Sequence, residues 1–265
     1  MRTVPARQGW FWLVRGFFLF RKNPAMWTLL VFSYWILIAL VNQIPVAGPL
    51  VATLFLPAFS VSFMAMCEEL DQRGPLRPML LFAGFRKQLP TLLILGALYL
   101  AAIVLVLGIS ALADGGALAN WVIYGTAPST TAIRDGSLSS ALIIAAMAGT
   151  PVVMAFWFAP VLAAWDGMGA AKALFFSFFA GWRNWRAFLF YGAVLALAGA
   201  ALSVALVTAA VMLRGHPDLL RLGLIAAVLV SMPTLFGSFY AAYRDIFPRT
   251  PSPAAPLAQS DSGAD

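Results

Sequence analysis

The side chains that could carry out chemistry are few in this sequence and stand far apart. The single histidine, His216, has Asp218 close by, whereas the single cysteine, Cys67, comes much earlier in the chain. A zinc site needs three or four good ligands, and a general base needs a positioned partner. The sequence contains no phosphate-binding glycine loop, dinucleotide fingerprint or nucleophile motif. We therefore predict no catalytic residue, no cofactor site and no metal site, and we expect a protein that is not an enzyme.

Polar groups are also sparse inside the apolar segments. All ten acidic residues fall at the ends of these segments, in loops or in the C-terminal tail. A proton-coupled or ion-coupled transporter usually carries an ionisable residue at mid-membrane depth. Prolines inside the segments could free backbone carbonyls for a ligand, although kinking for helix packing is the commoner reason for them. These prolines are Pro57, Pro151, Pro160 and Pro233.

Arginines, lysines and aromatic rings form the clearest chemical pattern. It occurs in three stretches, FLFRKNPAMW (18–27), AGFRKQLPTL (83–92) and FFSFFAGWRNWRAFLFY (175–191). Basic groups bind lipid phosphates, and indole rings settle at the depth of the headgroups. We therefore predict lipid-headgroup anchors at Arg15, Arg21, Lys22, Arg86, Lys87, Trp182, Arg183, Trp185 and Arg186.

The composition agrees with a membrane location. Of the 265 residues, 62% are hydrophobic and only 10% are charged, whereas a soluble domain is about half apolar and a quarter charged. The net charge of +7 comes from residues that border the apolar segments. This placement favours anionic phospholipid headgroups over nucleic acid as the partner. We predict an all-α integral membrane helical bundle with the lipid bilayer as its surroundings.

Apolar periodicity and length divide the chain into elements. Three amphipathic interfacial helices are expected over 6–20, 74–88 and 167–186, and the first of them could instead simply begin the first span. Residues 1–247 would form a single transmembrane domain, with a polar loop at 114–138 and a disordered cytoplasmic tail at 248–265. The six transmembrane helices are predicted at 25–44, 50–66, 89–112, 139–165, 187–213 and 219–243.

Charge distribution predicts the orientation. Of the 17 lysines and arginines, three lie on the side of the 114–138 loop and His216, and the rest lie on the other side. The positive-inside rule therefore places both termini in the cytoplasm of a bacterium, with the chain crossing the inner membrane several times.

The order of features recurs and suggests a threefold internal repeat, with units 6–71, 75–166 and 167–245. Each unit has an interfacial helix, an aromatic–arginine pair, a span, a proline-containing span and a closing acid. The alternative is that any bilayer protein places aromatic residues and arginines at its interfaces. The recurring residues are Arg21, Arg86 and Arg183, then Pro57, Pro160 and Pro233, then the closing acids Glu69, Asp166 and Asp245.

Small residues at helical spacing predict close helix contacts. Three such stripes are Ala141, Ala145 and Gly149; Gly192, Ala196 and Ala200; and Ala170, Ala173, Ser177, Gly181 and Asn184.

Nearly the whole chain apart from the loop and the tail resembles a family of uncharacterised proteobacterial multi-spanning inner-membrane proteins. The resemblance is carried by GWFWLVRGFFLFRKNPAMW, GPLVATLFLPAFSVSFMAMCEEL and AKALFFSFFAGWRNWRAFLFYG. The segment GAAKALFFS (169–177) is more loosely similar to the membrane domain attached to some glycerophosphodiester phosphodiesterases. The family implies an integral inner-membrane protein and supplies no catalytic residues.

Two functions remain open from the sequence. The first is a non-enzymatic protein that acts through lipid or through a membrane-protein partner, which includes a second copy of the chain. The alternative is a transporter or channel for an uncharged or amphiphilic solute.

Overall fold

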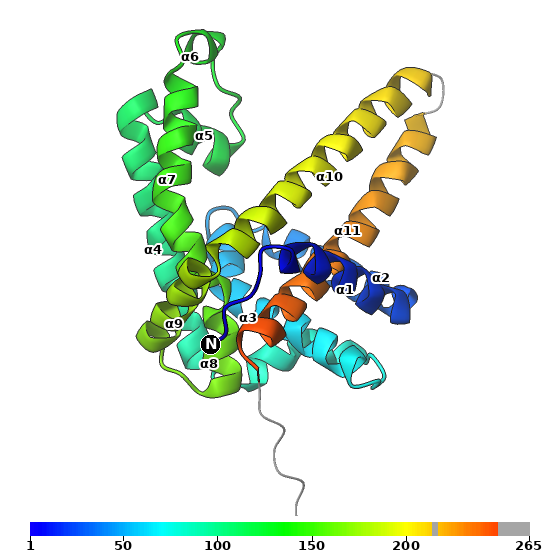
Figure 1. Cartoon of the computed structure of the whole chain (residues 1–265). Coiled ribbons are helices and arrows are strands. Elements are labelled where there is room, and N and C mark those ends of the chain that lie inside the picture. The colour runs from blue at the N-terminus through cyan, green and yellow to red at the C-terminus, as the bar shows by residue number, and fades with distance from the viewer. Residues whose placement is uncertain (214–216, 249–265) are drawn as a thin grey trace, which may run out of the picture.

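The computed structural model describes residues 1–213 and 217–248, and this part of the chain is built from helices joined by short turns (Figure 1). Six helical segments are long and apolar enough to cross a membrane, which confirms the predicted number of spans. They are α2 (Pro24–Val41), α3 (Ala47–Asp71), α4 (Leu89–Asp114), α7 (Ser137–Trp157) with α8 (Ala159–Asp166), α10 (Trp185–Met212) and α11 (Pro217–Ile246).

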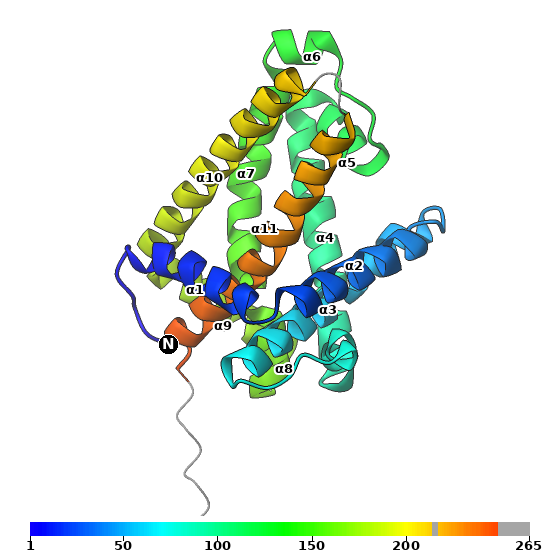
Figure 2. The ribbon, with the colours of Figure 1, turned by 90° about the vertical axis from the view of Figure 1, so that its right-hand side faces the viewer.

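The long helices form three hairpins that diverge from a shared base (Figures 1 and 2). The hairpins are α2–α3, α4–α7 and α10–α11. Three short helices lie at the base: α1 (Gln8–Lys22), η1 (Pro78–Arg86) and α9 (Ala170–Arg183). Here α1 packs on α11, η1 on α3, and α9 on α7 and α8. We call this end of the molecule the basic end, because the predicted arginine and lysine anchors lie there.

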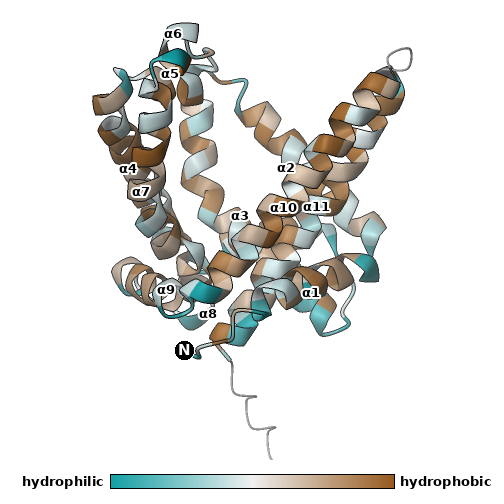
Figure 3. Ribbon diagram, turned by 45° about the horizontal axis from the view of Figure 1, so that its top comes forward, coloured by the Kyte–Doolittle hydropathy of each residue, from teal (hydrophilic) through white to brown (hydrophobic). Residues whose placement is uncertain are grey.

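Hydropathy follows this arrangement, with apolar residues along the long helices and polar ones concentrated at the turns and the base (Figure 3). The segment 114–138 differs from the polar loop that the sequence suggested, since it contains α5 (Ala117–Tyr124) and α6 (Thr130–Arg134). The Asp114 carboxylate accepts hydrogen bonds from the backbone N–H groups of Gly116 and Leu118, which starts α5 directly after α4.

Two elements depart from their predicted form. The second connecting stretch is a 3₁₀ helix, η1, rather than an α-helix. The fourth span is broken at Phe158, where α7 ends and α8 begins. The Ser177 hydroxyl enters this break: it accepts from the Phe158 backbone N–H at 2.9 Å and donates to the Met154 carbonyl at 2.8 Å. A side chain inserted in this way replaces the helical hydrogen bond and permits a sharp change of direction.

Short helices approach long helices most closely at glycines. Gly16 of α1 crosses α11 at Gly237, and a side chain on either residue would meet the backbone of the other helix. Gly84 of η1 similarly lies against the Ala58 carbonyl of α3, and its N–H donates to the Ser62 hydroxyl at 3.0 Å. The absence of Cβ atoms therefore allows these short helices to lie directly on the spans.

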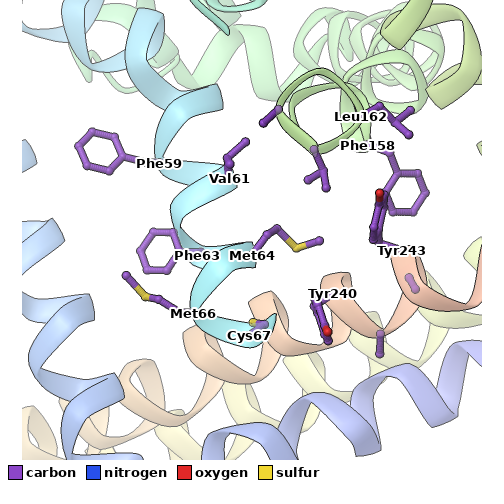
Figure 4. Packing of buried hydrophobic residues seen from close by; sticks show 14 of the residues in the cluster. Phe59, Val61, Phe63, Met64, Met66, Cys67, Phe158, Leu162, Tyr240 and Tyr243 are labelled. Carbon is purple, nitrogen blue, oxygen red and sulfur yellow. The ribbon is translucent and has the colours of Figure 1, made fainter. Parts of the chain in front are cut away.

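The buried core lies where the hairpins meet at the base (Figure 4). Phe63 of α3 stacks on Phe236 of α11 with ring centroids 4.0 Å apart, and Phe158 stacks on Phe239 at 5.4 Å. Tyr243 is fully buried beside Phe158. This aromatic packing joins α3, the α7–α8 break and α11.

The small-residue stripes have different outcomes. On α9, four members of the predicted stripe are buried, namely Ala173, Ser177, Gly181 and Asn184, so close packing is confirmed there. On α7, Ala141 is fully buried in the α4–α7 pair. On α10 the prediction was wrong: Gly192, Ala196 and Ala200 are exposed, because α10 diverges from its neighbours above the base.

Candidate functional site: a cavity within the bundle

The basic end is held together by carboxylates at the ends of three spans. Asp245 of α11 accepts hydrogen bonds from three donors on one face of α1: Gln8 Nε2 at 2.6 Å, Trp12 Nε1 at 2.9 Å and Arg15 at 2.9 Å. The donors lie about one helical turn apart, so a single carboxylate fixes α1 along α11. The predicted closing acid Asp245 therefore has a structural role.

The other two span ends also meet α11. Asp71 accepts from the Tyr240 hydroxyl at 3.1 Å and lies 3.7 Å from Arg244. Asp166 accepts from the Tyr243 hydroxyl at 3.3 Å. Asp71, rather than the predicted Glu69, therefore makes the contact that ties α3 to α11. Sequence spacing alone could not decide between these two acids, because both lie in the last turn of α3.

The predicted headgroup anchors gather at the basic end, and all of them are exposed. Arg15 pairs with Asp245, and Lys22 donates to the Leu70 carbonyl at 2.8 Å. Two arginines lie over neighbouring rings, Arg21 over Phe17 and Arg186 over Trp185. Within residues 1–213 and 217–248, none of the other basic anchors has an ion pair or a hydrogen bond; these are Arg86, Lys87 and Arg183.

Trp182 and Trp185 place their rings at the surface beside these arginines, with exposed fractions of 62% and 54%. Asp166 does not pair with Arg183 or Arg186 among the described residues. The geometry is compatible with the predicted interfacial role, and lipid binding at these positions stays a prediction.

A hollow lined by five of the six spans lies where they diverge from the base, and we call it the central cavity. Its volume is about 330 Å³. Every long helix except α10 contributes to it, and Pro57 and Pro160 are part of its wall. The wall is mostly aromatic, with Tyr34, Phe59, Phe63, Tyr99, Phe156, Trp157 and Phe236.

Three hydroxyl-bearing residues belong to the wall: Tyr34, Ser60 and Tyr99. None of them has a hydrogen-bond partner in the described part of the chain. The indole N–H of Trp157, another wall residue, is also unpaired, but it is inaccessible to solvent and therefore cannot donate to a molecule in the cavity. Hydroxyl-bearing residues that gather without hydrogen-bond partners in an otherwise apolar hollow mark a candidate ligand site.

The chemistry of this wall is limited to dispersion contacts and hydrogen bonding. Among the described residues, no carboxylate, lysine, arginine or histidine lines the central cavity. The described residues also contain no group of three or more His, Cys, Asp or Glu side chains that could hold a metal ion. His216 lies outside the described residues, and Cys67 is fully buried on α3. An uncharged molecule with an apolar body and hydrogen-bond acceptors matches such a wall best.

Comparison with known proteins agrees with an inner-membrane location. A probable inner membrane protein of Burkholderia thailandensis is 37% identical over 252 residues, which cover 92% of each chain. The chain belongs to this family of inner-membrane proteins. No family model matches the sequence, and no solved structure matches it. The resemblance predicted from the sequence is confirmed at this level, and the looser similarity to phosphodiesterase-attached membrane domains stays a prediction.

Sequence reasoning missed the central cavity, although part of its signal was present. Pro57 and Pro160 stand out in the sequence, but the aromatic residues that surround them come from separate positions along different spans. Tyr34 and Tyr99 each lie near the middle of a span, and a tyrosine at that depth is a polar group that needs a partner. That feature could have identified the site before the helices were placed.

Proposed function

We propose that this inner-membrane protein acts without catalysis, by holding an uncharged amphiphilic molecule of the bilayer in the central cavity. The supporting observation is the wall itself, in which the unpaired hydroxyl-bearing residues Tyr34, Ser60 and Tyr99 stand among aromatic rings, with no carboxylate or basic side chain from the described residues. A lipid with ester or hydroxyl oxygens, such as a diacylglycerol, offers acceptors for these donors and apolar chains for the rings. Anionic phospholipid headgroups would meet the exposed arginines at the basic end.

Co-purification tests this proposal. The protein is extracted in a mild detergent, and bound lipids are identified by native mass spectrometry. Changing Tyr34 and Tyr99 together to phenylalanine removes two hydroxyls and keeps both rings. We expect the bound uncharged lipid to be depleted in this double variant, because each lost hydrogen bond contributes roughly 1 kcal/mol. Tyr124→Phe, at a 77% exposed tyrosine of α5, is the matched control. An undiminished lipid signal in the double variant would refute the proposal.

Transport of an uncharged or amphiphilic solute is the second candidate. It is favoured by helix irregularities next to the central cavity: Pro57 and Pro160 in its wall, and the α7–α8 break at Phe158. Helices that bend at such positions could open the cavity to either side of the membrane. Substrate-dependent flux into proteoliposomes would favour transport over simple lipid holding.

The threefold repeat gains support from the packing. In each of the three units, a short helix at the basic end lies on a long helix: α1 on α11, η1 on α3 and α9 on α7. Each contact uses a small residue of the short helix, Gly16, Gly84 and Ser177 respectively. We propose that these are the interfacial helices of three parallel repeat units. The short helix of the second unit packs on the first unit, that of the third packs on the second, and that of the first packs on the third.

The orientation is proposed from charge, with the basic end and both termini in the cytoplasm. Single cysteines introduced at 72 and 130 test it in a variant with Cys67 changed to alanine. A membrane-impermeant maleimide added to intact spheroplasts should label position 130 and leave position 72 unlabelled. The reverse pattern would invert the topology.

A further inference from the structure

A second hollow, the lateral groove, lies outside the central cavity between α7, α9 and α10. Its volume is about 670 Å³, and its wall is almost entirely apolar. Val153 and Trp157 line both hollows, so these two side chains form the partition between them. The opposite wall is α10, which includes Trp185, Leu189 and Gly192.

The length of the lateral groove corresponds to one leaflet. Along α10 its wall runs from Trp185 to Leu195. Ten residues of α-helix rise about 15 Å, and the hydrocarbon core of a bilayer is about 30 Å thick. The groove wall on α10 is therefore about half as long as the hydrocarbon core is thick, and the predicted headgroup anchor Trp185 stands at one of its ends.

A positive charge stands at the headgroup end of this groove. The Arg186 guanidinium lies 5.4 Å from the centre of the Trp185 ring. Arg186 is exposed and makes no ion pair within the described residues. Arg183, also exposed, is the last residue of α9, three positions before Arg186. A planar guanidinium with free donors is well suited to a phosphate diester.

We infer that the lateral groove is a binding site for one anionic glycerophospholipid. One acyl chain lies between α7 and α10, and the phosphate contacts Arg186. This site is separate from the central cavity and does not depend on what the cavity holds.

The glycines of the two helices explain why the groove is open. A Cβ atom placed on Gly149 of α7 or on Gly192 of α10 would meet no heavy atom within 4 Å. Both residues line the groove. The small-residue stripes that predicted a direct contact between helices therefore leave room for an acyl chain instead. Larger side chains at these positions would begin in open space and would extend into the groove.

Filling the groove is the direct test. Wild-type protein and Gly192→Leu are titrated with phosphatidylglycerol in detergent, and binding is followed by native mass spectrometry. Gly199→Leu is the matched control, because Gly199 also lies on α10, also has open space within 4 Å of where a Cβ would stand, and is not part of the groove wall. Leucine favours a helix more than glycine does, so neither change should unfold α10. We expect Gly192→Leu to weaken the tightest phosphatidylglycerol site at least tenfold and Gly199→Leu to leave it unchanged.

Two further variants complete the experiment. Gly149→Leu fills the groove from the opposite helix and should have the same effect as Gly192→Leu. Arg186→Gln should abolish the preference for phosphatidylglycerol over phosphatidylcholine while the groove stays intact. Equal binding by Gly192→Leu, Gly149→Leu and wild type would overturn the inference, because it would leave only non-specific annular lipid. Removal of the Tyr34 and Tyr99 hydroxyls should not change phosphatidylglycerol binding in the lateral groove. A result that refutes the groove inference can therefore be told apart from one that refutes the proposed function.

Discussion

Removing the Asp245 carboxylate should weaken the attachment of α1 to α11, and the cost can be worked out from its three partners. Trp12 is fully buried, so loss of its acceptor leaves a buried indole N–H unpaired, at ~1–3 kcal/mol. The Arg15 side chain is 54% exposed, so its ion pair contributes at most about 1 kcal/mol. Gln8 is partly exposed and can regain water. Asp245→Ala should therefore lower the free energy of unfolding by about 3 kcal/mol.

Reversible unfolding in mixed detergent micelles, followed by circular dichroism, measures this change. Asp218→Ala is the control, because Asp218 is 86% exposed and its pair with Arg221 is 3.6 Å long; we expect a change within about 0.5 kcal/mol. The sharper test is a double-mutant cycle with Trp12→Phe, which removes the stranded donor. On that background Asp245→Ala should cost ~1–2 kcal/mol less. Strict additivity of the two changes would refute the assigned role of the carboxylate.

Three other changes test the packing and are measured by the same unfolding assay. Gly84→Ala should destabilise the protein by ~1–3 kcal/mol, because the added Cβ would meet the backbone of α3. The control Gly108→Ala, with open space around the added Cβ, should be neutral or stabilising. Equal effects of the two changes would refute the close approach of η1 to α3. Ser177→Ala should cost ~1–3 kcal/mol by leaving the Phe158 N–H unpaired, while Ser203→Ala on the exposed face of α10 should be nearly silent. Ala196→Leu should leave stability unchanged because Ala196 is exposed, and a clear loss would place α10 against another helix.

Composition and apolar run length were enough to predict the all-α class and the six spans, because the bilayer allows few alternatives to apolar helices. They could not predict the break at Phe158. It depends on the Ser177 hydroxyl, which comes from a different helix and replaces a backbone hydrogen bond. The helices α5 and α6 were missed for a related reason, since local caps at Asp114 and Ser129 override the loop-like composition of this segment.

The site was harder to predict than the fold. The exposure of the predicted arginines and tryptophans could be anticipated residue by residue, because charged and amphipathic side chains next to an apolar run favour its ends. The central cavity depends instead on how far the hairpins diverge, which no single span encodes. The stripe at Gly192 shows the same limit: spacing reveals that a helix has a face of small residues, and only the placement of α7 shows that Gly192 borders a groove.

The central claim is that the hollow between the spans binds an uncharged amphiphile through the Tyr34 and Tyr99 hydroxyls. Titration of the purified protein with dioctanoylglycerol, followed by native mass spectrometry, tests it most directly. We predict one saturable site, weakened about tenfold or more when both tyrosines are changed to phenylalanine, and unaffected by Tyr124→Phe. Binding that does not saturate, or that is equally tight in the double variant, would contradict the account.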